Sequence, residues 1–572
     1  MSATASPRVV TRPIDPRARE RLIGAGLHPV LARVYAGRGV TGPEDLVGSM
    51  GDLLAPDGML GIAEAAGRLA DAIARREPVL IVADYDCDGA TACAVGVRGL
   101  RAMGATVDYL VPNRLEHGYG LTPTIVDLAA KHPRLGRPAL LVTVDNGIAS
   151  IDGVARAREL GIDVVVTDHH LPGPQLPAAC AIVDPNQPGC AFESKHLAGV
   201  GVMFYVLLAL RALLRRRGAF TGGREPALQT LLDLVAVGTI ADLVRLDRNN
   251  RLLVAAGLRR IRAGQAHAGI RALFEICARP WREAGCEDIG FGLGPRINAA
   301  GRLADIAVGI ECLITDDEDH ARDLAGRLDA INRERRALEE RMREQAFEGA
   351  ADTEAGTCTR VVFRPDWHPG VVGLVASRLK DRDHLPAIAF APAGDPACLQ
   401  GSGRSIVGVH LRDAIDLAAK RAPGAVLRFG GHAMAAGLTV LADRLAEFRL
   451  CFDEAVARLA DPQAFSPQLD TDGSLADESV DLDLVGQIDA AVWGQGFPAP
   501  LFVDEAEVTG QRLLKDRHLR LDLRIAGRSY AAIAFGRADP LGRQARLAYR
   551  IARNDWGGRS SLQLIVERVL ED

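Results

Sequence analysis

The 572-residue sequence lacks the features of a membrane, secreted or zinc-ribbon protein. No apolar run reaches the roughly 20 residues that a membrane-spanning helix needs. The N-terminus, "MSATASPRVVTRPIDPRARE", has no apolar core of the kind found in signal peptides. None of the ten cysteines forms a CxxC pair, which disfavours a zinc ribbon or a disulfide framework. These absences predict a cytoplasmic protein with reduced thiols.

The sequence also has little excess charge and few aromatic residues. The formal net charge is −5 and aromatic residues make up 5 % of the chain. A nucleic-acid partner is therefore not indicated by bulk charge, and its binding surface would have to be a local basic patch. Hydrophobic residues at 48 % and charged residues at 25 % are typical of a globular protein with sizeable cores. The length favours about three or four domains.

From about residue 60, short Val/Ile/Leu-rich runs alternate with alanine-rich helical stretches. Such runs suit strands that are buried on both faces, and the alternation predicts a parallel sheet. Ligands of such sheets bind at the carboxyl ends of the strands. The predicted strands lie in 78–86, 108–113, 139–147, 162–170 and 180–186.

Farther along, the patterns change twice. Apolar residues at helical spacing over 320–347 predict one long helix that connects two domains. A second α/β region begins near residue 358, and the strict alternation in "HLRLDLRI" (518–525) predicts a small antiparallel barrel. The predicted divisions are 1–50, a loosely structured lead-in; 51–250, the first α/β domain; 251–347, a helical region with the connector; 348–460, the second α/β domain; 461–499, a linker; and 500–572, the barrel.

The stretch "VADYDCDGATA" (82–92) places Asp84, Asp86 and Asp88 at every second position, where the first strand is expected to end. In an extended strand the three carboxylates would share one face and repel one another unless a cation lay among them. An acidic turn is the alternative interpretation, since Asp and Gly favour turns. This stretch alone does not decide between the two.

Other predicted strands end in the same way. Their final residues supply further carboxylates and two imidazoles: Asp145, Asp168, His169, His170 and Asp184. A single such Asp usually caps a helix, but four strands that end alike are hard to explain by capping. Carboxylates suit Mg²⁺ or Mn²⁺ and imidazole shifts the preference toward Mn²⁺, with iron and zinc left open. The ligands suffice for two ions roughly 3.5–4 Å apart, an arrangement that serves phosphoryl displacement.

In their order and spacing, "DYDCDG", "VDNG", "TDHH" and "GTIADLV" (238–244) resemble the motifs of DHH-family phosphoesterases. "RINAAGRL" (296–303), "GSGRS" (401–405) and "GGHAMAAGLTV" (430–440) resemble the RecJ branch of that family, the single-strand-specific exonucleases. The resemblance runs from about residue 50 to the C-terminus. It implies an α/β fold with a DHH-type parallel-sheet catalytic domain, a long connector helix, an α/β DHH-associated domain and a C-terminal OB-like β-barrel.

The resemblance also implies roles for the acidic cluster. Asp145 would bridge two Mn²⁺ or Mg²⁺ ions, His170 would face the substrate phosphate, and Asp168 would orient the motif. Asp184 is expected to be structural, and Cys87, where relatives usually have alanine, is expected to point away from the ions. The implied metal ligands are Asp84, Asp86, Asp88, Asp145, His169 and Asp242.

Two glycine-rich loops carry candidate phosphate ligands. Such loops form anion nests to which Arg adds a bidentate fork, although each loop alone also fits a flexible surface segment. The resemblance assigns Arg114, Ser402 and Arg404 to a pocket for the 5′-terminal phosphate. Arg302 and Arg296 are candidates for the scissile phosphate, with the choice between them open. His432 is expected to bind the substrate backbone.

The C-terminal tail carries basic residues and an occasional aromatic, which fits single-strand binding, although a solvated barrel face is the alternative. These residues are Arg512, Lys515, Arg517, Arg520, Arg524, Arg553, Trp556 and Arg559.

The resemblance implies a monomeric, metal-dependent 5′→3′ exonuclease that degrades single-stranded DNA to 5′-mononucleotides in DNA repair and recombination. Single-strand-binding protein and a RecQ-type helicase are implied as partners. The alternatives are a phosphodiesterase for short oligonucleotides or cyclic dinucleotides, a pyrophosphatase, and a single-strand-binding scaffold with an inactive site.

Overall fold

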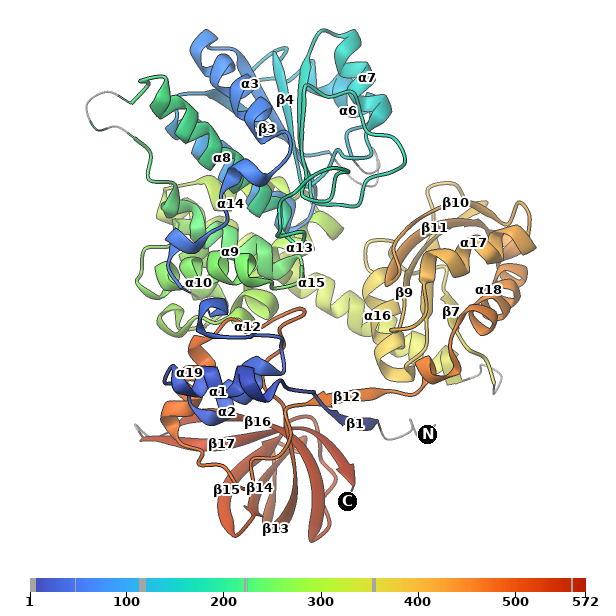
Figure 1. Cartoon of the computed structure of the whole chain (residues 1–572). Helices are drawn as coiled ribbons and strands as arrows, with labels where there is room; N and C mark the ends of the chain where they lie inside the picture. The colour runs from blue at the N-terminus through green and yellow to red at the C-terminus, as the bar shows by residue number, and fades with distance from the viewer. Residues whose placement is uncertain are drawn as a thin grey trace.

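Five parallel strands form the sheet of the first α/β domain, in the order β3-β2-β4-β5-β6. Every strand of this sheet is apolar at most positions because helices cover both faces, as the sequence predicts. In the computed structural model, which describes residues 7–46, 48–112, 120–220, 223, 225–351, 356–556 and 559–571, this domain lies at the top of Figure 1. The strands are β2 (Pro78–Ala83), β3 (Thr106–Leu110), β4 (Leu140–Val144), β5 (Asp163–Thr167) and β6 (Ala181–Val183).

The helices of this domain form two layers (Figure 1). Ile81 and Val142 belong to the core on one face of the sheet, whereas Val82 and Leu141 belong to the core on the other. Neighbouring residues of a strand thus face opposite layers. The first layer contains α3 (Ile62–Arg75), α4 (Cys87–Ala102) and α8 (Gly199–Arg216), and the second contains α6 (Pro123–Ala129) and α7 (Ile151–Glu159).

A helical region follows, and its last helix confirms the predicted connector. This helix, α15 (Glu318–Ala351), packs its first half on the helical region, where Leu328 is fully buried, and its second half on the next domain through Met342. Within the described part of the chain, no helix has both the length and the apolar character needed to cross a bilayer. The preceding helices are α9 (Leu232–Ala241), α10 (Arg248–Arg262), α11 (Ala268–Ile276), α12 (Cys286–Asp288), α13 (Gly294–Leu303) and α14 (Ala307–Ile314).

The second α/β domain has a mixed sheet in the order β10-β11-β9-β8-β7, in which only β7 and β8 are parallel neighbours. It lies to one side of the molecule in Figure 1, attached through α15. Its strands are β7 (Arg360–Phe363), β8 (Ala387–Pro392), β9 (Cys398–Arg404), β10 (Val426–Gly431) and β11 (Ala435–Leu441). Its helices are α16 (Val372–Asp383), α17 (Leu411–Arg421) and α18 (Leu445–Leu459).

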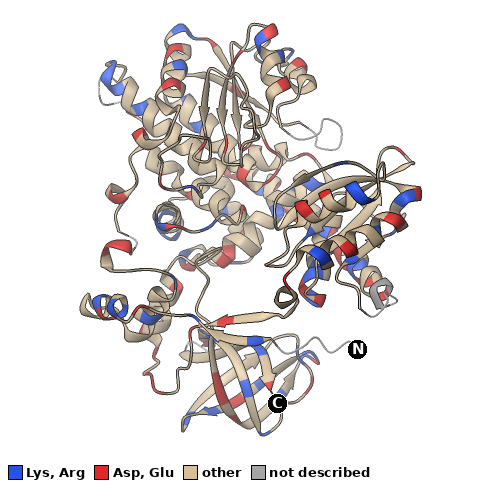
Figure 2. Ribbon diagram, turned by 45° about the vertical axis from the view of Figure 1, so that its right-hand side comes forward, with Lys and Arg blue, Asp and Glu red and all other residues tan. Residues whose placement is uncertain are grey.

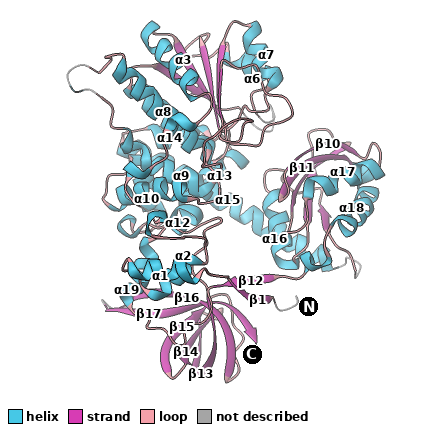
Figure 3. Cartoon of the chain, viewed as in Figure 1, coloured by secondary structure: helices cyan, strands magenta, loops and turns pink. Residues whose placement is uncertain are grey.

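The C-terminal strands close into a barrel, β13-β14-β15-β17-β16, which is the almost purely β-stranded body at the bottom of Figure 3. The alternation predicted for β14 is confirmed, because Leu519, Leu521, Leu523 and Ile525 are at most 3 % exposed. With this barrel the predicted fold class is confirmed. The strands are β13 (Phe502–Leu514), β14 (His518–Ile525), β15 (Arg528–Ala534), β16 (Gln544–Trp556) and β17 (Arg559–Glu571).

The expectation that residues 1–50 are loosely structured is wrong for the described residues of that segment. There β1 (Arg8–Thr11) pairs in parallel with β12 (Gln468–Thr471), and α1 (Pro16–Gly24) and α2 (Pro29–Ala36) follow. The prolines misled the prediction because they occupy first helical turns, where a missing N–H costs nothing. The expected linker, 461–499, carries β12 and α19 (Leu482–Ala490), and α19 packs on the barrel.

A buried ion pair joins the N-terminal helices to the chain before the barrel. Arg38 donates to both carboxylate oxygens of Asp472, at 2.7 and 3.0 Å, and both side chains are nearly inaccessible to solvent. Arg38 also donates to the carbonyls of Val34, Pro498 and Ala499, so one guanidinium links α2 to the segment that leads into β13.

We expect Asp472→Ala to lower the free energy of unfolding by about 3–5 kcal/mol, because it leaves a buried guanidinium without its counter-charge. The matched control is Arg21→Ala, which breaks an ion pair with Glu44 in which both side chains are more than half exposed; solvent screens such a pair, so this variant should unfold close to the midpoint of the unaltered protein. Thermal unfolding of both variants measures the difference, and equal midpoints would contradict the role given to the buried pair.

Candidate metal centre and phosphate pocket

The alternation of the three aspartates in "DYDCDG" predicted that they lie on a strand, and this prediction is wrong. Strand β2 ends at Ala83, Asp86 is the N-cap of α4 and accepts from the Gly89 amide at 3.0 Å, and Asp88 lies in the first helical turn. The capping hydrogen bond turns the chain into a helix, where successive side chains no longer alternate between two faces. As a result, Asp84 and Asp86 face Asp145, whereas Asp88 faces His169 and Asp242.

The N-terminus of α8 holds Asp88. This carboxylate is fully buried and accepts from the amides of Gly199, at 2.6 Å, and Val200, at 2.9 Å. The positive end of the helix dipole favours a negative charge at this point. A side chain at Gly199 would place its Cβ 2.7 Å from the Cβ of Asp145, so the close approach of α8 to the acidic cluster requires glycine.

His169 lies at the centre of the acidic side chains. Its Nε2 atom is 3.0 Å from Asp145 Oδ1, 3.6 Å from Asp242 Oδ2 and 3.9 Å from Asp88 Oδ2. Asp145 directly follows β4 in the left-handed backbone conformation, with φ of 62°. Asp242 caps the C-terminus of α9. The carboxyl ends of two strands and one helix thus converge with α4 on a single imidazole.

Three groups of these side chains could hold a metal ion, because the ligand atoms within each group lie within 4.8 Å of one another. Asp145 and His169 each belong to two groups. Among the described residues, Asp145 Oδ1 and His169 Nε2 are both buried and form no hydrogen bond, which fits ligand atoms oriented for a cation. The groups are Asp84, Asp86 and Asp145; Asp88, His169 and Asp242; and Asp145, His169 and His170.

The electrostatics of the cluster also favour a cation. Burial and then the neighbouring carboxylates raise the pKa of Asp88 and of Asp145 well above the usual range. Burial and the charge of Asp86 raise the pKa of Asp242 to about 7, and burial lowers the pKa of His169 to about 4. The carboxylates therefore tend to hold protons by themselves, and a divalent ion among them reverses this preference. Oxygen donors with one imidazole fit Mn²⁺ or Mg²⁺.

Asp168 lies outside the three groups and fixes the loop that carries the histidines. It is buried, accepts from the amides of Ile148 and His169 at 2.9 and 2.8 Å, and lies 2.7 Å from His170 Nδ1. Asp184 is also outside the groups and accepts from the Asn186 amide at 2.7 Å. Cys87 belongs to none of them; its backbone amide donates to Asn298 on α13 at 2.7 Å.

A cavity of about 530 Å³ brings together three of the predicted phosphate ligands, Arg302 from α13 and Ser402 and Arg404 from β9. Arg404 donates to the Ser402 hydroxyl at 3.1 Å. The N-terminus of α16 borders this pair, since a Cβ at Gly373 would lie 2.9 Å from Ser402 Oγ. The cavity also contains Arg428, which the sequence analysis missed although it directly precedes the "FGGH" stretch.

Arg296, an alternative to Arg302, is not in this cavity. Its guanidinium contacts Asp329 on α15 at 2.8 and 2.9 Å and donates to the Gly292 carbonyl at 2.8 Å, so it ties α13 to the connector. Burial and then the charge of His170 lower the pKa of His432. His432 is therefore close enough to His170 for the two charges to interact. Arg114 lies outside the described residues.

Helix α13 links the acidic cluster to the cavity. A Cβ at Gly301 would lie 1.8 Å from the Tyr85 carbonyl oxygen, so this glycine allows α13 to pack directly on the "DYDCDG" loop. The next residue, Arg302, donates to the Gly370 carbonyl of the second α/β domain at 3.3 Å. The two halves of the site are therefore positioned by adjacent residues.

Most basic residues of the barrel are interspersed with acidic ones, as Figure 2 shows. Arg524 pairs with Glu507 at 3.0 Å, and Arg553 pairs with Asp555 at 3.0 Å. Arg512 lies opposite Arg520 across the β13–β14 pair, which leaves a basic stretch at that hairpin. The Trp556 side chain lies outside the described part of the chain.

Three segments of the chain match known domain families. Residues 78–239 match the DHH family, N-terminal domain, residues 356–458 match the DHHA1 domain, and residues 471–568 match the RecJ OB domain. These segments correspond to the parallel-sheet domain, the mixed-sheet domain and the region that contains the barrel.

Comparison with whole proteins gives matches along the full chain. The single-stranded-DNA-specific exonuclease RecJ of Escherichia coli (strain K12) is 45 % identical over 562 residues, which cover 95 % of this chain and 96 % of that protein. The crystal structure of RecJ from Thermus thermophilus in complex with Mn²⁺ is 29 % identical with a TM-score of 0.81, and that of its Mg²⁺ complex is 27 % identical with a TM-score of 0.76. The matches cover all of this chain and 80 % and 79 % of those chains.

We expect Mn²⁺ to raise the thermal unfolding midpoint of the unaltered protein at pH 7 and to raise that of Asp145→Ala much less. A cation at about one hundred times its dissociation constant stabilises the folded state by about 2.7 kcal/mol. Asp184→Asn is the matched control, because burial raises the pKa of Asp184 to about 8 and an amide of equal size replaces a protonated acid. A full response of Asp145→Ala, or a lost response of Asp184→Asn, would contradict the ligand assignment.

We also expect the raised pKa values of Asp242, Asp184 and His170 to cost the metal-free protein stability as the pH rises from about 4 to about 9, with the carboxyl groups acting between about pH 4 and 8 and His170 between about pH 6.5 and 9. The raised pKa values of Asp242 and Asp184, about 7 and 8, mean that the folded state holds protons that the unfolded chain has already released. Burial lowers the pKa of His170, but its hydrogen bond to Asp168 and nearby carboxylates outweigh burial and raise it to about 9, so its stabilisation is complete below pH 6.5 and lost above. Unfolding midpoints in EDTA should fall across this window, and Mn²⁺ should reduce the fall. Midpoints in EDTA that do not change with pH would contradict this expectation.

Proposed function

Because the chain belongs to the RecJ family of single-stranded-DNA-specific exonucleases, we propose that it removes nucleotides from the 5′ end of single-stranded DNA and releases them as 5′-mononucleotides. One observation carries the proposal. The acidic cluster and the cavity of Arg302, Ser402 and Arg404 are joined by α13, which reaches both. A cation centre therefore lies beside an anion pocket, as cleavage of a polyanion at its end requires.

We assign two ions, Mn²⁺ or Mg²⁺, to the acidic cluster. RecJ from Thermus thermophilus has been solved in complex with each of these ions. The presence of Asp145 in two ligand groups supports its role as the bridge between them. When bound, the ions supply charge stabilisation and a water of lowered pKa. The proposed ligands are Asp84, Asp86, Asp88, Asp145, His169 and Asp242.

The chain itself positions the substrate and offsets charge. The Asp168 carboxylate keeps the His170 ring in place and protonated, and we assign His170 a hydrogen bond to the substrate phosphate. Arg302 offers its guanidinium to the scissile phosphate, where negative charge develops. We assign His432 a contact with the substrate backbone; the charge of His170 lowers the pKa of this residue.

The size of the cavity supports the release of mononucleotides. We assign the 5′-terminal phosphate to Ser402 and Arg404, with Arg114 as a further ligand, and the scissile phosphate to Arg302. Ser402, Arg404 and Arg302 line one cavity of about 530 Å³, within the range of a small-ligand site. We infer that two phosphates held in one cavity are neighbours on the strand, so that each cleavage removes a single nucleotide and the 5′ end defines the direction.

Two other functions compete with this proposal. A phosphodiesterase for short oligonucleotides or cyclic dinucleotides would need the acidic cluster but not the five-stranded barrel, and the hairpin with Arg512 and Arg520 favours a longer strand. An inactive single-strand-binding scaffold would not need to keep a complete set of metal-competent side chains at the cluster.

The remaining assignments follow the family. We place the reaction in the cytoplasm, in DNA repair and recombination, and the ten free thiols fit a reducing compartment. We expect a monomer, with single-strand-binding protein and a RecQ-type helicase as partners.

The test is a Mn²⁺-dependent digestion of a long single-stranded DNA that is labelled at either end. We expect the 5′ label to leave first as a mononucleotide and Asp145→Ala to abolish its release. If the long strand survives while dinucleotides are cleaved, the small-substrate phosphodiesterase replaces the proposal. If neither is cleaved and the strand still binds, the scaffold replaces it.

The 5′-phosphate pocket has its own test in Arg404→Ala. Loss of a charge-assisted hydrogen bond of about 1.5–3 kcal/mol should raise KM about 10- to 100-fold for a 5′-phosphorylated strand. The same variant should change KM little for a strand with a 5′-hydroxyl, which has no terminal phosphate to lose. Equal effects on both strands would place Arg404 elsewhere on the substrate.

A further inference from the structure

The phenyl ring of Phe291 is 69 % exposed in the turn that leads into the arginine-bearing helix α13. This turn, Ile289–Leu293, is π-helical, a local widening that often marks functional sites. Single exposed apolar side chains are common and need no explanation by themselves. The position of Phe291 relative to the cavities of the molecule provides a second and independent observation.

Three cavities share lining residues in a row. The phosphate cavity shares Arg302 with a second cavity of about 460 Å³ beside α15. That cavity shares Phe291 with a third, of about 1020 Å³, which reaches β16 and β17 of the barrel. At 1.5 Å of rise per residue, Phe291 and Arg302 are roughly 16 Å apart along the helix. A strand whose 5′ end is in the first cavity therefore meets Phe291 before it meets the barrel.

The second cavity is rich in positive charge. Arg336 is exposed and forms no hydrogen bond or ion pair within the described part of the chain, so it is available to a phosphate. The charged residues that line this cavity are five arginines and two glutamates: Arg302, Arg335, Arg336, Arg343, Arg378, Glu339 and Glu340. Such a surface attracts a polyanion.

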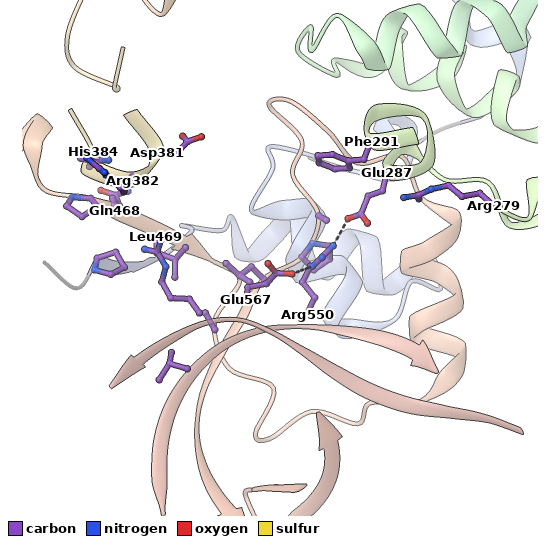
Figure 4. A pocket seen from close by; sticks show the side chains of 18 residues that line it. Arg279, Glu287, Phe291, Asp381, Arg382, His384, Gln468, Leu469, Arg550 and Glu567 are labelled. Carbon is purple, nitrogen blue, oxygen red and sulfur yellow. Dashed lines mark hydrogen bonds and ion pairs between the residues drawn. The ribbon is translucent and has the colours of Figure 1, made fainter. Parts of the chain in front are cut away.

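The third cavity is less positive overall, because four arginines and three acidic side chains line it. Figure 4 shows Phe291 on the helical side of this cavity, near Glu287, which pairs with Arg550. Arg550 also pairs with Glu567 at 2.6 Å, and Arg279 pairs with Asp288. The third cavity therefore attracts a phosphate less strongly than the second, and the aromatic ring of Phe291 lies where the two cavities meet, in a position to hold a base.

We propose that Phe291 is a stacking platform for a base of the single strand, a few nucleotides beyond the scissile phosphate, with Arg336 contacting the phosphate on the way to it. This inference rests on the proposed exonuclease function and adds the path of the substrate toward the barrel. Stacking on an aromatic ring tolerates any base, so such a contact suits an enzyme that must move along a strand of any sequence.

The experiment measures steady-state digestion of a 5′-phosphorylated strand long enough to reach the barrel. Phe291→Ala should raise KM about tenfold and leave kcat unchanged. Phe291→Trp should keep the low KM, whereas Phe291→Leu should lose it, which separates stacking from mere apolar contact. Leu450→Ala is the matched control, because Leu450 on α18 is also 69 % exposed but lines none of the three cavities.

A single abasic position moved along the strand locates the contact. In the unaltered protein, an abasic site at one position of the strand should weaken binding, which fluorescence anisotropy measures. In Phe291→Ala, an abasic site at that position should not weaken binding further. An unchanged KM in Phe291→Ala, or an equal loss of activity on a dinucleotide, would overturn the inference, the latter because it would indicate a structural role for the turn. If the unaltered protein digests no strand, the exonuclease proposal fails, and the abasic binding series still tests Phe291.

Discussion

Repulsion among buried carboxylates is the constraint on which the site depends. Asp88 and Asp145 are buried, and the cluster tends to stay protonated unless a cation enters it. The surrounding structure is arranged to tolerate this. The amides of α8 compensate Asp88, and burial keeps the His169 imidazole neutral and able to bind a metal. The first α/β domain thus forms a preorganised receptor for divalent ions.

Helix α13 positions the phosphate cavity relative to the acidic cluster. Gly301 packs on the loop of the first acidic motif, and Arg302 extends from the same helix turn to the second α/β domain. Arg296, earlier on the same helix, anchors α13 to α15 through Asp329. The helix therefore fixes the position of the anion pocket relative to the cations through the close approach at Gly301 and the contacts of Arg296 and Arg302.

Sequence alone predicts what depends on local patterns. Buried strands, the long connector and the alternating barrel strand all follow from periodicity, and the acidic cluster follows from strands that end in Asp. Sequence-based prediction fails where tertiary contacts determine the position of a side chain. The capping bond of Asp86 turned a predicted strand end into a helix, and the Asp329 carboxylate engaged Arg296. Phe291 lies outside every recognised motif and Arg428 lies just before one, and the environment of both became visible only through the cavities that they line.

The parallel pairing of β1 with β12 has a consequence for how the protein is made. Arg8 lies opposite Gln468, and Arg38 pairs with Asp472, so the first helices depend on residues more than four hundred positions later. During synthesis, the N-terminal segment leaves the ribosome on the order of a minute before its partner strand exists. The contacts of the N-terminal segment with β12 and Asp472 therefore form only after the second α/β domain has been synthesised, although this segment is made first.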